Sequence, residues 1–260
     1  MLFTRFCKNV VRPPLRKFGS QVHLSGDIKS LKHHTLQHNV KRSALHSTQT
    51  RNCSDDSQYR VQLPPLTDDP PIVWPTFFRS VKNFLQCKLI IQPRMDNDFT
   101  IEEFLDGSKY AMSTVSHALA AENYDSIRNL VSPEALQTAR NKINTLSSEQ
   151  KQLIAVNKDD IYVTFPYEIG IMYDDDRADQ KFVEITTVYH SLRGLARMRA
   201  EDKEPPINMG MLPEYRNLLF VSNYRFIREY TEGVESSWTI NMINHLMSTS
   251  VRNVLLFNMS

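Results

Sequence analysis

The sequence predicts an α+β domain in which N-terminal helices pack on an antiparallel sheet. Apolar residues recur with helical spacing between residues 76 and 155, and they alternate as in strands between residues 161 and 243. A block of helices followed by a block of strands is the order of an α+β fold. The chain has 260 residues, of which 41% are hydrophobic and 23% charged, so it is neither wholly disordered nor fibrous. It has no apolar run near the roughly 18 residues that a membrane-spanning helix needs.

The N-terminal segment carries nearly all of the excess positive charge. Residues 1–54 hold ten Lys/Arg and one acid, a net charge of +9, whereas the remaining residues hold 21 Lys/Arg and 28 Asp/Glu, a net charge of −7. Leu2, Phe6 and Val10 recur on one helical face, and no long apolar core of a secretory signal is present. We therefore expect residues 1–51 to be a mitochondrial transit peptide. A basic arm that binds acidic partners is the alternative.

Residues 52–75 are expected to form a linker. The segment contains five prolines and several aspartates. Proline fixes φ and removes a backbone donor, so the composition predicts an extended, disordered linker.

Residues 76–95 follow as a predicted basic amphipathic helix. Its apolar stripe consists of Phe77, Val81, Phe84, Leu85 and Leu89. Arg79, Lys82 and Lys88 are interleaved with this stripe, and no acid occurs from residue 70 to residue 95. Such a helix can lie on an anionic membrane surface, with Phe77 and Phe84 inserted and the three cations at the headgroups. The alternative is a helix packed on its own domain with a solvated basic edge.

Residues 96–246 are the predicted α+β domain. Thr100 and Glu103 have the spacing of a capping box, and Phe99 and Phe104 that of a hydrophobic staple, so a helix should run from residue 101 to about 121. Further helices are expected at 124–131 and at 133–146, and Ser147 with Gln150 should cap a short fourth one. The Asp96-x-Asp98 pattern before the first helix resembles a calcium loop, but the glycine and the glutamate that such a loop requires are absent.

The strands come next along the chain. We expect short strands at 161–165 and 169–173, then 182–192, 218–230 and 238–243. Asp174–Asp176 should form a polar turn, residues 196–214 a loop, and residues 247–260 a C-terminal tail. In the longest strand Phe220, Tyr224 and Phe226 point one way. With Trp238 they could line a cavity for a hydrophobic client segment, or they could be the core face of the sheet under the helices.

Signatures of catalysis are missing from the sequence. It contains no Walker loop, dinucleotide fingerprint, HExxH or nucleophile elbow, so we predict no catalytic, cofactor or metal site. His117, His190 and His245 lack partners at ligand spacing and are expected to be structural. Cys87 is expected to be a buried thiol. An aspartate metal site at 174–176 is a weaker alternative to a solvated turn.

Two stretches of the chain resemble a known family. DFTIEEFLDGSKYAMSTVSHALAAENYDSIRNLVS, residues 98–132, is similar to the opening of the domain found in the import-motor tether of the mitochondrial inner membrane. FIREYTEGVESSWTINMINH, residues 226–245, with that opening resembles the m-AAA protease-interacting proteins, matrix members of the same superfamily. The resemblance covers roughly residues 76–245, and neither stretch is a catalytic signature.

This resemblance implies a cone-like domain with helices wrapped around a curved antiparallel sheet. It implies a non-enzymatic matrix protein, peripherally associated with the inner membrane, that binds the AAA protease there. It also implies a role in protein import, in which the chain protects or sorts a newly imported small membrane protein, the regulator of the calcium uniporter, before processing and assembly.

Two other functions are weighed against this one. A structural protein of the mitochondrial large ribosomal subunit can carry the same domain, but it would need a basic surface, and the net charge of −7 after residue 54 disfavours nucleic acid as a partner. A small-molecule enzyme would need convergent titratable groups, and Glu184 with His190 is the one nearby couple on a strand face.

Overall fold

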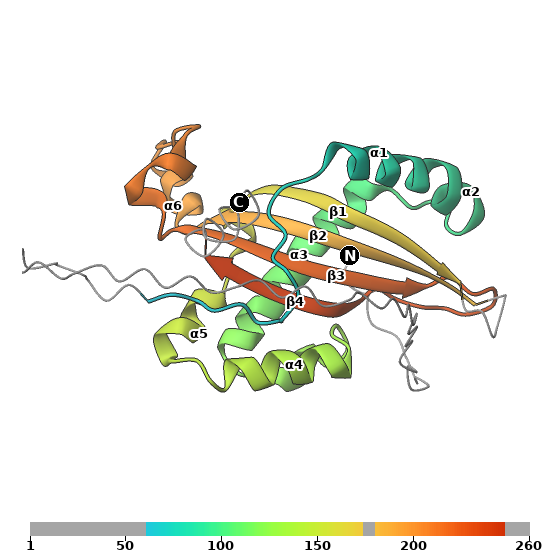
Figure 1. The fold of residues 1–260 in the computed structure, drawn as a ribbon, viewed down its shortest axis with the longest axis horizontal. Coiled ribbons are helices and arrows are strands. Elements are labelled where there is room, and N and C mark those ends of the chain that lie inside the picture. Colours follow the sequence, from blue (N-terminus) through green and yellow to red (C-terminus); the bar gives the residue numbers. More distant parts are fainter. Residues whose placement is uncertain (1–60, 174–179, 248–260) are drawn as a thin grey trace, which may run out of the picture. The chain divides into compact units, whose positions relative to one another are not determined.

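A computed structural model describes residues 61–173 and 180–247 (Figure 1). The predicted transit peptide, the turn at 174–176 and the tail beyond residue 247 lie outside the described residues. Helices precede strands, so the predicted α+β order is confirmed. The curvature of the sheet stays a prediction.

The sheet is an antiparallel meander of four strands in chain order. The strands are β1 (Ile161–Tyr173), β2 (Lys181–Leu192), β3 (Leu219–Glu229) and β4 (Thr239–Met247). β1 is one strand where the sequence predicts two, because Pro166 lies in an edge strand, where the missing N–H breaks no ladder bond. The register shifts between Pro166 and Glu168. β4 extends four residues beyond its predicted end.

The helices of the described residues form three groups along the chain. Before the domain come α1 (Phe77–Gln86), a π-helical turn (Cys87–Ile91) and α2 (Gln92–Arg94). The domain then begins with α3 (Ile101–Ala120), α4 (Pro133–Ile143) and α5 (Ser148–Ile154), close to their predicted positions. α6 (Leu195–Ala200) and two short 3-10 helices occupy the predicted loop 196–214.

The cap of α3 forms in part. The hydroxyl of Thr100 accepts a bond from the N–H of Glu103 at 3.3 Å, but the returning bond from the glutamate is not among the bonds of the described residues. The staple forms, with the rings of Phe99 and Phe104 6.2 Å apart. A complete capping box occurs instead at Ser147 and Gln150 of α5.

The prediction of a helix at residues 124–131 is wrong. Only a 3-10 turn, Tyr124–Ile127, is helical there. The backbone beyond it bonds to the edge of β4: Ile240 donates to Leu130 O at 2.8 Å, and Ser132 donates to Ile240 O at 2.7 Å. Pairing with the strand therefore replaces the last turn of the predicted helix.

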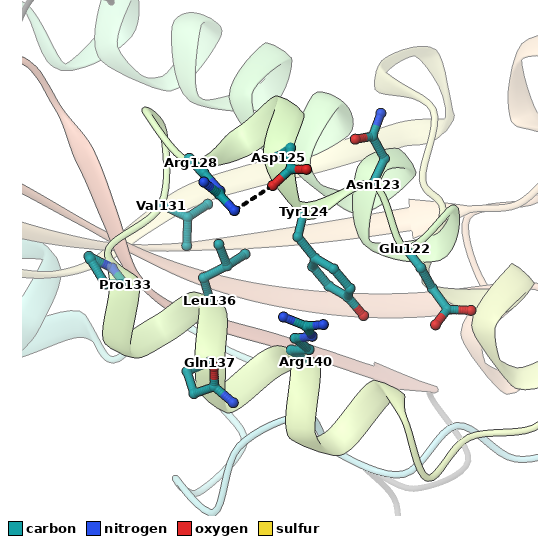
Figure 2. A pocket seen from close by; sticks show the side chains of 10 residues that line it. All are labelled: Glu122, Asn123, Tyr124, Asp125, Arg128, Val131, Pro133, Leu136, Gln137 and Arg140. Carbon is teal, nitrogen blue, oxygen red and sulfur yellow. Dashed lines mark ion pairs between the residues drawn. The ribbon is translucent and has the colours of Figure 1, made fainter.

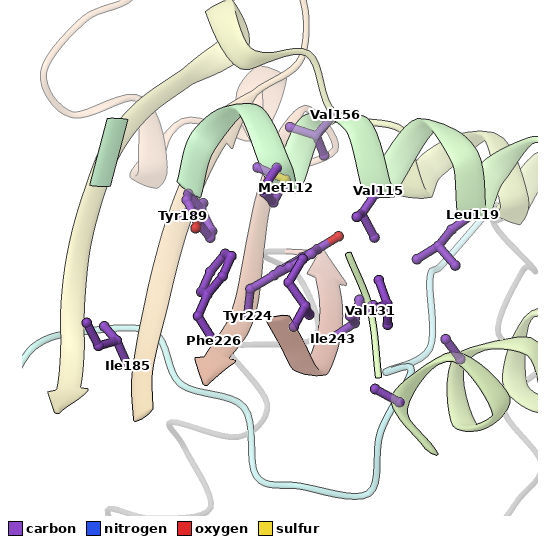
Figure 3. Close-up of a cluster of buried hydrophobic side chains, with 14 of the residues drawn as sticks. Met112, Val115, Leu119, Val131, Val156, Ile185, Tyr189, Tyr224, Phe226 and Ile243 are labelled. Carbon is purple, nitrogen blue, oxygen red and sulfur yellow. The ribbon is translucent and has the colours of Figure 1, made fainter. Parts of the chain in front are cut away.

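The main core lies between one face of the sheet and α3, α4 and α5 (Figure 3). α3 contributes Met112, Val115 and Leu119, each fully buried, and the sheet meets them with Tyr189 and Tyr224. Apolar residues spaced three and four apart on α3 thus face alternate residues of the strands.

Residues 61–75 form a strap that packs around the β4 edge of the sheet (Figure 1). Leu63 and Leu66 are fully buried in the core on the helix side, whereas Ile72 and Val73 pack on the opposite face. The strap contains no helix or strand, as expected of its prolines. It is nevertheless packed on the domain, in contrast to the poorly ordered linker expected from its composition.

Three buried side chains of the sheet hold the backbone of the strap. Asn223 accepts from the N–H of Ile72 at 3.0 Å and donates to its carbonyl at 2.7 Å. His190 donates from Nε2 to Val73 O at 2.8 Å, and Leu66 donates to Asn244 Oδ1 at 2.9 Å. These bonds satisfy backbone groups that have no ladder partner.

Candidate interaction surfaces

The apolar stripe of α1 and the turn after it faces solvent. The side chains share exposures between 43% and 82%; they are Phe77, Phe78, Val81, Phe84, Leu85 and Leu89. Trp74, directly before the helix, is 61% exposed. Residues 77–94 are helical, and Phe77 and Phe84, which are predicted to touch a membrane, are exposed. Large contiguous apolar patches on a protein surface typically mark interaction sites.

The opposite, docked side of α1 is centred on a polar residue. Asn83 is buried; it donates from Nδ2 to Pro166 O at 3.2 Å and to Tyr167 O at 3.1 Å, and accepts from the N–H of Ile169 at 3.0 Å. These bonds satisfy the free edge of β1 at its irregular register. The helix is thus attached to the sheet by hydrogen bonds, and none of the described residues covers its apolar side.

The π-helical turn after α1 keeps the docked side in line. Asn83, Cys87 and Ile91 are buried at intervals of four residues. In a regular α-helix, with about 3.6 residues per turn, side chains four apart would point in progressively different directions. The π-helical turn has more residues per turn and keeps the three side chains on one side. Burial raises the pKa of the Cys87 thiol to about 11, so the thiol is neutral and unreactive at physiological pH.

The three cations predicted for a membrane surface differ in their partners. Arg79 pairs with Glu168 at 2.6 Å and lies over the ring of Tyr167, 4.6 Å from its centroid. Lys82 is 3.7 Å from the same carboxylate. Lys88 has no ion pair among the described residues. Lys88 is therefore available to a lipid headgroup, whereas Arg79 is bound to Glu168 of the sheet. Lys82 interacts with Glu168 more weakly and could reach a headgroup as well.

The four aromatic residues considered for a client cavity are core residues here. Phe220, Tyr224, Phe226 and Trp238 are each at most 8% exposed. Phe104 of α3 packs against Phe226 and Trp238, with ring centroids 5.4 and 4.8 Å away. In the structure this strand face is the core face of the sheet under the helices, rather than the lining of a cavity for a client segment.

A buried polar group accompanies this core. His245 lies with Nδ1 3.1 Å from the hydroxyl of Ser222 and Nε2 2.9 Å from that of Tyr224. Burial lowers the pKa of His245 to about 3, so the imidazole is neutral and acts as a hydrogen-bond link. His190 is also buried, which lowers its pKa, and His117 meets Asn157 at 3.1 Å. No group of three metal-ligating side chains occurs within residues 61–173 and 180–247.

Two pockets flank α4. One, of about 580 Å³, lies between α4 and the preceding 3-10 turn (Figure 2). Its polar side chains include Tyr124, Arg128 and Arg140. The other, of about 250 Å³, lies between α4, the strap and β4, and it is lined by Asp68, Asp69 and Glu134 as well as Arg225. Helix α4 thus separates a pocket lined by two arginines and two carboxylates from one lined by three carboxylates and one arginine.

Sequence reasoning missed the strap contacts and the pockets. Leu63, Leu66 and Ile72 lie among prolines, where neither helical nor strand periodicity can reveal burial. Trp74 and Phe78 extend the exposed stripe. The only feature of the sequence that points to them is that they are large aromatic residues. The pocket residues come from a 3-10 turn and a helix face that give no motif.

No model of a known protein family matches the chain. The chain is homologous to mammalian proteins named m-AAA protease-interacting protein 1, mitochondrial. It is 28% identical over 249 residues to the protein of Mus musculus. The aligned residues are 93% of this chain and 79% of the mouse protein. It is 28% identical over 241 residues to that of Rattus norvegicus, covering 90% and 77%. With the protein of Homo sapiens it shares 30% identity over 166 residues, 60% of this chain and 54% of the human one.

Proposed function

We propose that this chain is a non-enzymatic mitochondrial adaptor that binds the m-AAA protease on the matrix side of the inner membrane. Homology to the mouse protein over 93% of the chain supports a role associated with this protease. The proposed association with the membrane is peripheral. In the described part of the chain no helix is long and apolar enough to span a bilayer.

The exposed stripe of α1 is the observation that carries the membrane part of this proposal. Phe77 and Phe84 would enter the boundary between headgroups and acyl chains, with Lys88, and in part Lys82, near anionic headgroups. Arg79 is held by Glu168 and would contribute less. Each cation near such a surface is worth about 1 kcal/mol.

The proposed client is a newly imported small membrane protein, the regulator of the calcium uniporter, which the adaptor would protect or sort before processing and assembly. Support comes from the family resemblance and from charge. The chain after residue 54 has a net charge of −7, which complements the basic presequence of an imported protein.

A pull-down of the tagged chain from gently solubilised mitochondria tests the partner. Mass spectrometry should recover m-AAA protease subunits together with small inner-membrane precursors. Recovery of large ribosomal subunit proteins instead, lost on ribonuclease treatment, would overturn the adaptor proposal in favour of a ribosomal one.

Flotation with vesicles tests the membrane surface separately. The double variant Phe77→Ser/Phe84→Ser should float less with vesicles of neutral and anionic phospholipid. Tyr173→Ser, which changes an aromatic residue exposed elsewhere, is the matched control. Lys88→Gln should weaken binding by about fivefold, and only where anionic lipid is present. Equal flotation of all variants would contradict membrane docking through α1 and leave the protease proposal standing.

A further inference from the structure

The pocket between α4 and the 3-10 turn before it contains two hydrogen-bond donors without acceptors. The guanidinium of Arg140 lies over the ring of Tyr124, 5.3 Å from its centroid, and pairs with no carboxylate of the described residues. The hydroxyl of Tyr124 is buried and has no hydrogen-bond partner in the described chain. Figure 2 shows the Tyr124 side chain of the 3-10 turn pointing toward Arg140 of α4.

The other charged groups of this pocket are already paired. Asp125 holds Arg128 at 2.7 Å, and Glu122 holds Lys151 at 2.7 Å. After these pairs are formed, the positive charge of Arg140 is left over. A ligand that meets both free donors should therefore carry a negative charge and accept hydrogen bonds, as a carboxylate does.

Apolar surface lies beside these donors. Val131 is buried at the base of the pocket, and Leu136 and Pro133 of α4 form the side opposite Tyr124. A free inorganic anion would leave this surface unused. A volume of about 580 Å³ holds several side chains, so a short peptide fits the chemistry better than a single small ion.

We propose that this pocket binds an acidic peptide segment in which a glutamate or aspartate neighbours an aliphatic residue. The carboxylate accepts from Arg140 and from the Tyr124 hydroxyl, and the aliphatic side chain packs on Leu136. The pocket on the far side of α4 is lined by three carboxylates and one arginine, a net negative charge that disfavours the same peptide. This site is independent of the stripe of α1, and the proposal requires neither membrane nor protease.

Nuclear magnetic resonance with the purified full chain tests the site apart from the proposed function. The probe is the capped peptide acetyl-Gly-Leu-Glu-Glu-Leu-Gly-amide, and the control is the same peptide with Gln at both Glu positions. We expect the acidic peptide to shift amide signals in residues 122–140 and to bind about tenfold more tightly than the neutral one at low salt.

Variants of the pocket sharpen this test. Arg140→Gln should abolish the preference for the acidic peptide, and Arg140→Lys should restore part of it. Tyr124→Phe keeps the ring and should weaken binding a few-fold, whereas Arg94→Gln, an exposed arginine at the end of α2, should change nothing. The proposal is overturned if both peptides bind equally, if the shifts map outside the pocket, or if neither peptide causes shifts at millimolar concentration.

Discussion

Helices α1 and α3 are both amphipathic, yet their apolar stripes have opposite fates. α3 buries Met112, Val115 and Leu119 against the sheet, whereas α1 leaves Phe77 and Phe84 in solvent. α1 docks instead through Asn83 and an ion pair between Arg79 and Glu168. A helical pattern of apolar residues therefore shows that a face will be covered, but it does not show by what. In α3 the cover is the chain itself, and for α1 we propose a membrane.

Removing one apolar side chain from α3 and one from the exposed stripe of α1 and the turn after it should give the largest contrast. Leu119→Ala leaves a cavity in the main core and should lower the free energy of unfolding by about 2–5 kcal/mol. Leu89→Ala removes the same atoms from the exposed stripe and should change it by no more than about 0.5 kcal/mol. Urea unfolding of the two variants measures both values. A comparable loss for Leu89→Ala would mean that the stripe of α1 is covered in solution.

The polar docking of α1 gives the next largest effect. Asn83→Ala leaves the N–H of Ile169 and the carbonyls of Pro166 and Tyr167 without their partner, which should cost about 1–3 kcal/mol. Hydrogen exchange should rise at Ile169, and the thiol of Cys87 should become easier to alkylate in a background lacking the other cysteines. Ser80→Ala, on the exposed part of the same helix, is the control. Unchanged alkylation would show that α1 does not depend on Asn83.

These two helices also show which structural features can be predicted from the sequence. The start of α3 was predictable, because Thr100, Phe99 and Phe104 are local signals for a helix N-terminus. The stripe of α1 was equally visible. Its outward orientation was not, because that depends on Asn83 meeting a strand more than eighty residues away.

The strap and the pocket beside α4 were beyond prediction for the same reason. The prolines of the strap favour an extended chain in either an ordered or a disordered segment, and the difference lies in Asn223 and His190, far along the chain. Tyr124 lies in the 3-10 turn that forms in place of the helix predicted at 124–131, and Arg140 lies over its ring. Long-range contacts, rather than local propensity, decide these features.

The face that α3 covers contains an ionisable group, and this predicts that stability depends on pH. The folded pKa of His245 is lowered to about 3, below the ~6.5 of an unfolded histidine, so the unfolded chain binds the proton first as pH falls. The contribution of His245 to stability should therefore be full above about pH 6.5 and fall by up to about 1.4 kcal/mol per pH unit below it. Urea unfolding between pH 7 and pH 5 measures the slope, which His245→Gln should reduce and His117→Gln should not. A histidine signal from His245 that titrates near pH 6 in the folded chain would contradict this burial.

The smallest contrast concerns how the two helices begin. Thr100 caps α3 through its hydroxyl, whereas Thr76 at the start of α1 makes no side-chain cap bond. Thr100→Ala should therefore lower the free energy of unfolding by about 1 kcal/mol, and Thr76→Ala should leave it nearly unchanged. Urea midpoints of the two variants, measured beside the unmodified chain, separate these values. A loss at Thr76 as large as that at Thr100 would mean that α1 is capped in solution and that its ends, like its docked side, are held by polar bonds.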